Sequence, residues 1–225
     1  MVATTTRVHV RALNVMAPAS DKLSVGSEAF TVYVLVVACP ETRSWWMLQK
    51  RYSQFRALRS ELALARRAVK AKVPVLAAAI ADALDTPFPR KHLMLTTDCL
   101  AVINQRKRGL QQFTGHLVAL RALCLHWKSH DDDDKVRQLV QTTGALLTDF
   151  LRAPAMDAPA TTATRALDCS ICLEQSIEED EMQTPPVALV MPCGHAFHEA
   201  CLVKWLETDC SCPLCRTRAT HGTVA

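Results

Sequence analysis

Between residues 169 and 215 the chain reads Cys169-x2-Cys172, then twenty residues, then Cys193-x-His195-x2-His198-x2-Cys201, then ten residues, then Cys212-x2-Cys215. Cysteine sulfur and histidine nitrogen are ligands that zinc prefers in proteins, and a structural zinc site takes four of them in a tetrahedron. Close-spaced groups of this kind can each place two side chains on one metal ion from a single turn. The eight ligands therefore predict two zinc sites, which decide how the last third of the chain folds.

One further cysteine, Cys210, lies two residues ahead of Cys212. It could replace Cys212 as a ligand if the register of the last pair slipped. The run from Cys212 to Cys215 makes the tighter turn, so we expect these two residues to bind metal and Cys210 to be surplus.

The chain has 225 residues and ten cysteines, which could form disulfides in an oxidising compartment. Its first 15 residues contain threonine, arginine and histidine but no apolar segment of a secretory signal. The longest apolar runs, Val32–Cys39 and Val73–Ala81, are too short to cross a membrane. We therefore expect a soluble intracellular protein whose clustered cysteines bind zinc rather than one another.

Charge is divided unevenly along the chain. The first 165 residues hold 23 basic and 13 acidic residues, a net charge of +10, whereas the remainder holds three basic and nine acidic residues, a net charge of −6. A basic front half favours an anionic partner, such as a membrane surface or nucleic acid.

The front half begins with a pattern of strands. Alternating and β-branched residues predict three strands in succession, at residues 6–15, 28–39 and 44–49. The turns between them are short, so the strands are expected to form an antiparallel meander. From Tyr52 onward the apolar residues recur at helical spacing, with Ser53 expected as the N-cap.

The segments that follow alternate between helix and loop. Pro87 and Pro89 predict an extended loop at residues 85–91. The run Asp131–Asp134 is expected to be a solvated loop or a helix start. The Ala/Pro/Thr-rich segment 153–166 is expected to be a linker. Helices are predicted at residues 73–81, 97–126 and 135–151.

Three segments of the front half match one known family in order. They are Lys50-Arg51-Tyr52-Ser53-Gln54-Phe55-Arg56-Ala57-Leu58, Phe88-Pro89-Arg90-Lys91 and Arg106-Lys107-Arg108-Gly109-Leu110-Gln111-Gln112-Phe113. The first resembles the R-[YF]-x-x-F-x-x-L signature of PX (phox-homology) domains, the second their Pro-rich loop ending in lysine, and the third their R-x-x-x-L-x-x-[FY] helix. The resemblance covers roughly residues 5 to 128.

The PX resemblance implies a phosphoinositide pocket. Arg51 would hold the 3-phosphate as a forked, permanently charged donor, and Tyr52 would pack under the inositol ring. Lys91 would contact the 1-phosphate, and Arg106 the ring hydroxyls. Apolar residues beside the loop would dip into the headgroup layer: Phe88, Leu93, Met94 and Leu95.

Two alternatives bear on this pocket. Arg51 and Tyr52 could be a surface arginine that caps a helix beside a core tyrosine, without a ligand. Nucleic acid is not expected as a partner, because the basic residues occupy pocket positions and no reading helix or aromatic-rich sheet motif accompanies them.

The ligand order Cys-Cys-Cys-His-His-Cys-Cys-Cys resembles the RING-H2 family over residues 168–216, and it excludes the PHD arrangement, in which a single histidine comes fifth. The resemblance implies two closed, interleaved structural Zn²⁺ sites without an open coordination position. By that pattern one zinc is held by Cys169, Cys172, His198 and Cys201, and the other by Cys193, His195, Cys212 and Cys215.

The RING-H2 resemblance also implies a surface for a ubiquitin-conjugating enzyme. Ile171, Trp205 and Pro213 would form a shallow apolar groove, with Trp205 on a short helix over residues 198–207. Arg216 would be the linchpin that bridges the conjugating enzyme and ubiquitin, without becoming a nucleophile. The alternatives are core packing for Trp205 and a solvated charge for Arg216.

Together the resemblances predict an α+β fold, with a PX-like three-stranded antiparallel meander packed on helices and a small cross-brace RING domain with two zinc ions. They imply a RING-type E3 ubiquitin ligase that positions a ubiquitin-charged conjugating enzyme (E2) for transfer to a lysine of an unknown substrate. The PX domain would recruit it from the cytoplasm to endosomal or vacuolar membranes that carry phosphoinositide, expected to be phosphatidylinositol 3-phosphate. The alternative is a membrane-trafficking adaptor whose RING only mediates protein contacts. The predicted bounds are 5–128 for the PX-like domain, 129–152 for a helical extension, 153–166 for the linker and 167–218 for the RING-H2 finger.

Overall fold

The computed structural model describes residues 9–12, 31–90, 100–127, 134–153, 169–173 and 187–225. The chain forms two compact units. The first, the sheet unit, comprises Met1–Val15, Val34–Leu48 and Pro154–Ala225, and the second, the helical unit, comprises Met16–Tyr33 and Gln49–Ala153.

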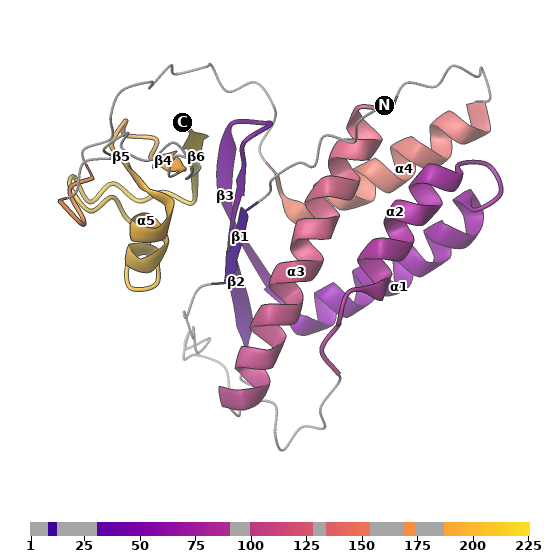
Figure 1. Ribbon diagram of the computed structural model, residues 1–225, viewed down its shortest axis with the longest axis horizontal. Helices are drawn as coiled ribbons and strands as arrows, with labels where there is room; N and C mark the ends of the chain where they lie inside the picture. Colours follow the sequence, from indigo (N-terminus) through magenta and orange to yellow (C-terminus); the bar gives the residue numbers. More distant parts are fainter. Residues whose placement is uncertain (1–8, 13–30, 91–99, 128–133, 154–168, 174–186) are drawn as a thin grey trace, which may run out of the picture. The chain divides into compact units, whose positions relative to one another are not determined.

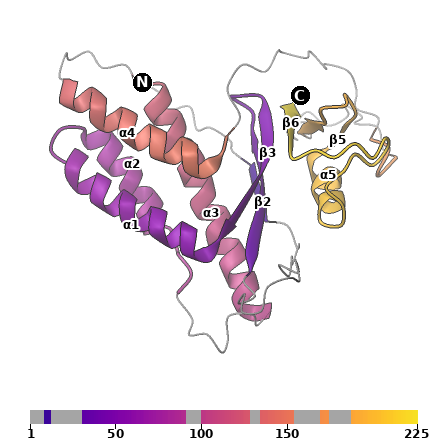
Figure 2. The same ribbon diagram turned by 180° about the vertical axis from the view of Figure 1, so that it is seen from behind.

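One sheet of six strands organises the sheet unit (Figures 1 and 2). Its strands are β1 (His9–Ala12), β2 (Val32–Cys39), β3 (Ser44–Arg51), β4 (Ala188–Val190), β5 (Ala196–His198) and β6 (His221–Val224), in the order β1-β2-β3-β6-β4-β5. The three strands predicted in the front half are confirmed, with β3 two residues longer than expected. No sequence pattern predicted β4, β5 or β6. The strand β6 pairs antiparallel with β3 on one side and with β4 on the other.

A close approach between β3 and β6 depends on one glycine. Gly222 is opposite Trp45 in the register, and a Cβ atom at Gly222 would lie 2.1 Å from the carbonyl oxygen of Val190 and 2.5 Å from Trp45 Nε1. The indole N–H of Trp45 donates a hydrogen bond of 2.9 Å to that same carbonyl. No side chain fits between these groups, so only glycine allows the strands to pair at this point.

The sheet unit has one core, to which both the front strands and the zinc-ligand region contribute. Trp45 is fully buried among apolar side chains from β2 and β3 and from residues 169–224. The core contains Val34, Val36, Ala38, Trp45, Met47, Cys169, Leu189, Met191, Phe197, Leu202, Leu206, Cys212, Ala219 and Val224. The apolar residues of the zinc-ligand region are therefore buried against the front strands as well as against one another.

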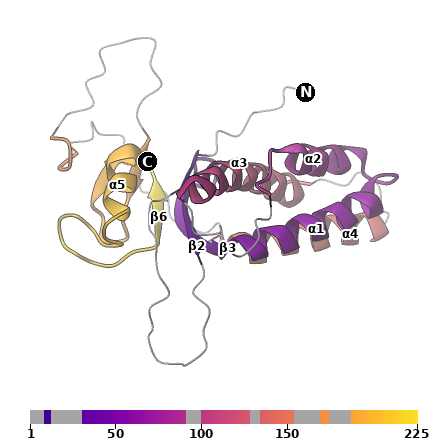
Figure 3. The same cartoon turned by 90° about the horizontal axis from the view of Figure 1, so that it is seen from below.

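In the described residues the helical unit contains four helices, α1 (Tyr52–Val69), α2 (Pro74–Asp85), α3 (Leu100–Leu125) and α4 (Asp134–Leu151). Figure 3 shows α2 and α3 on one side of this group and α1 and α4 on the other. The apolar stripe of α1 buries Phe55, whose ring meets Phe150 of α4 edge to face at 5.2 Å. The helices predicted from the 3.6-residue period are confirmed, although α2 runs four residues beyond the expected end.

The expected N-cap of α1 was wrong. Arg51, not Ser53, occupies the cap position, because the helix already begins at Tyr52. The side-chain oxygen of Gln54 accepts a hydrogen bond of 2.8 Å from the backbone N–H of Arg51. This contact satisfies the helix start without a serine hydroxyl. At the other predicted helix start, Asp134 opens α4 and its carboxylate accepts a hydrogen bond of 2.8 Å from Arg137.

Several predictions concern residues outside the described part of the chain. These are Lys91, Leu93, Met94, Leu95, most of the Asp131–Asp134 run and nearly all of the linker at 153–166. Among the described residues, no helix combines the length and the apolar character needed to cross a bilayer.

Leu62 and Leu64 of α1 test the packing of the helical unit. Leu62 is fully buried and Leu64 is 63% exposed. Replacing Leu62 by alanine should lower the free energy of unfolding by about 2–5 kcal/mol, because it leaves a cavity. The matched change Leu64→Ala should cost no more than about 0.5 kcal/mol. Urea denaturation followed by circular dichroism measures both, and equal losses would contradict this assignment of the buried face.

Candidate functional site

Eight cysteine and histidine side chains come together as two groups of four. One group contains Cys169, Cys172, His198 and Cys201, and the other contains Cys193, His195, Cys212 and Cys215. Within each group the four donor atoms lie within 4.8 Å of one another. Ligands from one end of the sequence segment therefore meet ligands from its middle, and the pairs interleave as the RING-H2 resemblance implies.

Two tight turns of the same design place the outer cysteine pairs. The amide of Leu173 donates to the carbonyl of Cys169 at 2.8 Å, and the amide of Arg216 donates to the carbonyl of Cys212 at 2.9 Å. Leu173 and Arg216 both have left-handed backbones, with φ of 61° and 63°. This conformation costs roughly 1–2 kcal/mol for a residue with a Cβ atom. Each turn folds back directly after its second cysteine, so both sulfurs point to the same side.

The middle ligands are placed by the hairpin of β4 and β5 and by the helix that follows. Gly194 lies between Cys193 and His195 with φ of 87°, a conformation that favours glycine. Its amide donates to the carbonyl of Met191 at 2.8 Å, which closes the turn of the hairpin. His198 ends β5, and Cys201 follows within the first turn of α5 (Glu199–Leu206).

The donors crowd one another closely. His195 Nδ1 lies 3.3 Å from the sulfur of Cys193 and 3.5 Å from that of Cys212. In the other group, His198 Nδ1 lies 3.4 Å from the sulfur of Cys172. Burial raises the pKa of the Cys201 thiol to about 12, and the neighbouring cysteines act in the same direction.

A divalent cation removes this conflict, because it neutralises thiolates that would otherwise repel one another. Tetrahedral zinc with bonds near 2.3 Å requires sulfur atoms about 3.8 Å apart, which fits the observed clustering. At the exposed edge, hydrogen bonds from Thr217 lower the pKa of Cys215 to about 6, which favours the thiolate that zinc binds. Donor type, number and spacing thus fit two structural zinc ions.

Cys210 does not join either group. Its thiol is half-buried, and burial raises its pKa. It packs against the core of the sheet unit instead.

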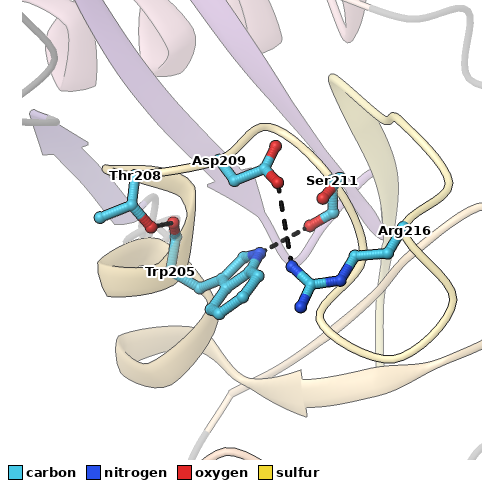
Figure 4. A network of polar contacts seen from close by, with 5 residues as sticks. All are labelled: Trp205, Thr208, Asp209, Ser211 and Arg216. Carbon is cyan, nitrogen blue, oxygen red and sulfur yellow. Dashed lines mark hydrogen bonds and ion pairs between the residues drawn. The ribbon is translucent and has the colours of Figure 1, made fainter.

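Beside the second zinc group lies a small contact network around Trp205, shown in Figure 4. The indole N–H of Trp205 donates to the carbonyl of Ser211 at 2.8 Å, which fixes the ring orientation. The Arg216 guanidinium lies over the indole, 5.0 Å from the ring centroid. Its Nη1 is 3.9 Å from a carboxylate oxygen of Asp209. Trp205 and Arg216, two of the residues singled out from the sequence, are therefore in direct contact.

The other residues predicted to contact the conjugating enzyme are partly exposed. Ile171 packs against the edge of the same core as Trp205, and Pro213 lies within the last cysteine turn. Sequence reasoning did not single out Leu173 and Leu214, which are 85% and 55% exposed. Leu214 lies inside the last cysteine turn and Leu173 directly follows the first, and that position was the available signal.

In the helical unit, Tyr52 is the centre of an aromatic and cationic stack. The Arg106 guanidinium lies 4.2 Å from the centroid of the Tyr52 ring, and Phe88 stacks on Tyr52 at 5.8 Å. The hydroxyl of Tyr52 donates to the carbonyl of Pro89 at 2.5 Å. Burial raises the pKa of Tyr52, while the positive charges of Arg106 and Arg56 oppose this shift.

Arg106 is itself buried, although it carries a full charge. Its Nη1 lies 3.5 Å from the hydroxyl of Tyr33, and its Nε has no hydrogen-bond partner in the part of the chain that the structure describes. A buried guanidinium nitrogen without a partner is costly and marks a place where a ligand can supply one. Arg51 lies exposed at the start of α1, next to Tyr52. The structure thus brings three of the predicted lipid contacts, Arg51, Tyr52 and Arg106, to one place.

Residues that sequence reasoning missed shape the surroundings of this stack. A hollow of about 450 Å³ borders Tyr52 and is lined by Arg56 and Arg59. The Pro-rich loop reaches α3 at Gly109, where a Cβ atom would lie 2.7 Å from the ring of Pro89. A glycine inside a predicted helix was the available signal, since it often marks a close backbone approach.

Comparison with known proteins gives two family matches in chain order. A model described as "PX domain" matches residues 40–130, and one described as "Ring finger domain" matches residues 167–216. No solved structure matches the chain.

Similar relatives match a short part of the chain. An uncharacterized RING finger protein of Schizosaccharomyces pombe is 52% identical over 58 residues, which are 26% of this chain and 7% of that protein. RING finger protein 122 of Homo sapiens is 51% identical over 47 residues, 21% of this chain and 26% of that protein. E3 ubiquitin-protein ligase SIRP1 of Oryza sativa subsp. japonica is 38% identical over 58 residues, 26% of this chain and 16% of that protein. The chain thus covers about a quarter or less of the length of these relatives.

Metal content distinguishes the two registers of the last cysteine pair. The variant Cys212→Ser should lose one of its two zinc ions, because one tetrahedral site loses a ligand. Cys210→Ser should keep both, since Cys210 lies outside both groups. Zinc per chain, measured by plasma mass spectrometry after dialysis, separates the outcomes. Retention of both ions by Cys212→Ser and loss of one by Cys210→Ser would establish the slipped register instead.

The family matches and the geometry lead to the same description. Residues 40–130 match the PX model and contain the stack around Tyr52. Residues 167–216 match the RING model and contain both interleaved ligand groups in the RING-H2 order. The chain therefore carries a PX domain followed by a C-terminal RING-type zinc finger of the RING-H2 kind.

Proposed function

We propose that the protein is a RING-type E3 ubiquitin ligase that a PX domain recruits to phosphoinositide membranes. The observation that carries the ligase assignment is the contact between Trp205 and Arg216 beside a complete set of eight zinc ligands. An inert zinc scaffold needs the ligands alone. Two relatives named E3 ubiquitin-protein ligase support the ligase assignment, being 38% and 39% identical to this chain over 58 and 57 residues.

The ligase mechanism that fits these residues is positioning without covalent chemistry. All eight ligand side chains are engaged when zinc is bound, so none of them is available as a nucleophile. Ile171, Trp205 and Pro213 offer a partly exposed apolar surface on which a conjugating enzyme can dock. Exposed Leu173 and Leu214 extend that surface.

Arg216 is the residue that accelerates the transfer of ubiquitin. Its guanidinium has several N–H donors and is 65% exposed, so it can reach groups of both the conjugating enzyme and ubiquitin. Restricting the mobile thioester to one reactive arrangement lowers the entropic part of the barrier to attack by a substrate lysine. The Trp205 ring holds Arg216 near the docking surface before the partner arrives.

For the PX domain, we assign the phosphoinositide pocket to Arg51, Tyr52, Lys91 and Arg106, with the 3-phosphate on Arg51. An inositol ring that packs on Tyr52 takes the place of the Arg106 guanidinium over one face of the tyrosine ring. Arg106 then donates to ring hydroxyls, which gives its unpartnered Nε and its charge hydrogen-bond acceptors. One such site, together with shallow insertion of the loop, supports reversible binding to endosomal or vacuolar membranes.

Single-turnover discharge of ubiquitin from a charged E2 tests the ligase assignment. Arg216→Ala should slow transfer to lysine at least about tenfold while E2 affinity changes little, because it removes positioning rather than docking. Ile171→Ala should instead weaken E2 affinity by about 1–2 kcal/mol.

The control is Arg218→Ala, which removes an exposed arginine two residues farther along. It should leave the rate of ubiquitin discharge unchanged. If no conjugating enzyme in a broad panel supports transfer or self-ubiquitination, the ligase proposal fails and the adaptor function replaces it.

Flotation on liposomes tests the lipid pocket. Arg51→Ala should weaken binding to vesicles that contain phosphatidylinositol 3-phosphate by roughly tenfold, since a charge-assisted hydrogen-bond pair is lost. Arg67→Ala removes the same charge from an exposed position near the far end of α1 and should bind almost as the wild type does. Equal losses in both variants would reduce the interaction to general charge attraction and remove the pocket.

A further inference from the structure

The strand β6 joins the front strands of the sheet unit to the zinc finger. It pairs with β3 over Ser44–Trp46 and with β4 over Leu189–Val190. Two more backbone hydrogen bonds flank the β3 pairing, from Val224 N–H to the Arg43 carbonyl at 2.9 Å and from Met47 N–H to the Thr220 carbonyl at 2.7 Å. One continuous hydrogen-bonded ladder therefore crosses from residues near the start of the PX match to residues beyond the last zinc ligand.

The core beneath this ladder is also shared. Val34, Val36 and Met47 of the front strands are buried in the same cluster as Phe197 and Leu202 of the finger. Without the finger, these apolar side chains of β2 and β3 would face water, and without β2 and β3 the finger would lose part of its core. Each part therefore supplies a surface that the other needs buried.

Each zinc group contributes one ligand to this core. Cys169 belongs to the first group and Cys212 to the second, and both are buried in the shared cluster at 1% and 0% exposure. A change in the position of these cysteines is transmitted directly to the side chains around Trp45. The metal groups are thus connected to β3 through packed side chains and not through the linker alone.

The connections meet at Trp45. It is fully buried, pairs with Gly222 across the ladder and donates its indole N–H to the Val190 carbonyl of β4. The carbonyl of Val190 lies so close to Gly222 that no side chain fits at that position. Trp45 and Gly222 therefore fix the spacing of β3, β6 and β4 as one assembly.

We propose that strands β2 and β3 and the zinc finger form one cooperative folding unit, so that the two metal groups stabilise both strands, of which β3 lies within the PX match. Release of zinc then loosens β2 and β3 as well as the finger. The structural coupling stands apart from the function proposed above. Its consequence for membranes, loss of lipid binding when zinc is lost, rests on the proposed phosphoinositide site.

Hydrogen exchange on the full chain, with mass spectrometry of its peptides, tests the coupling. In the zinc-loaded protein, peptides from residues 32–51 should be protected. After zinc is removed with a chelator, their exchange should accelerate at least about tenfold, together with that of residues 187–225, because one unit opens as a whole. Acceleration confined to residues 169–225, with residues 32–51 unchanged, would overturn the proposal.

A pair of variants in β6 tests the same coupling with zinc present. Gly222→Val places a side chain against the Val190 carbonyl and Trp45. It should speed exchange in residues 44–51 and 187–198 together, by at least about tenfold. His221→Val introduces the same residue at the exposed neighbouring position and should change neither segment. Faster exchange of residues 187–225 alone in Gly222→Val would again overturn the coupling.

A milder variant keeps the coupling testable if Gly222→Val does not fold. Trp45→Phe keeps an aromatic ring in the core but removes the hydrogen bond to Val190. Although the change lies in β3, it should hasten zinc transfer to a competing chelator by several-fold. An unchanged zinc transfer rate would show that β3 does not support the finger.

Liposome flotation before and after chelation separates the two proposals. If the zinc-loaded protein binds phosphoinositide vesicles and the chelated protein does not, both stand. If the zinc-loaded protein fails to bind at all, the lipid assignment fails, while the exchange of residues 32–51 still decides the coupling.

Discussion

Crowding of soft donors is the constraint on which the C-terminal part of the chain depends. Eight cysteine and histidine side chains occupy two small volumes, and within each the donor atoms lie closer than 4.8 Å. Burial first and the neighbouring cysteines second raise the pKa of Cys201, so thiolates are unfavourable there without a metal ion, and they become favourable around a divalent cation. The left-handed residues Leu173 and Arg216 illustrate the same balance, because turns that cost conformational energy persist where metal bonds secure them.

The zinc finger of this chain is also stabilised by packing. Its apolar residues, such as Phe197 and Leu202, belong to a core that includes Trp45 from a distant strand. A short finger rarely buries enough apolar surface by itself, and here the front strands supply more of it. Metal binding and side-chain packing therefore act on the same residues, with Cys169 and Cys212 taking part in both.

The surroundings of Tyr52 show how a charged pocket can be kept ready without its ligand. Arg106 is buried and would be costly there by itself, but the Tyr52 ring gives its charge a favourable neighbour. Gly109 lets the Pro-rich loop approach α3, and the loop in turn accepts the hydrogen bond of the Tyr52 hydroxyl. In the proposed function, Arg106 occupies the face of Tyr52 until a phosphoinositide binds there. Arg106 then forms hydrogen bonds to the ligand in place of its stacking on Tyr52.

The sequence alone determined the features that depend on local spacing. The ligand spacing at Cys169–Cys215 was sufficient to predict two metal groups. The change from a two-residue to a helical period located the front strands and α1 to α4. Both signals involve residues that are close together in the chain. The sequence did not indicate β6, the pairing of Trp45 with Gly222 or the contact of Arg216 with Trp205. The Ser53 cap failed for a similar reason, since the strand continued to Arg51 and the helix began two residues earlier than a cap at Ser53 requires. Only the tertiary structure decided that the finger shares a core with strands more than a hundred residues earlier, because burial of an apolar face depends on which distant surface covers it, and no local pattern specifies that surface.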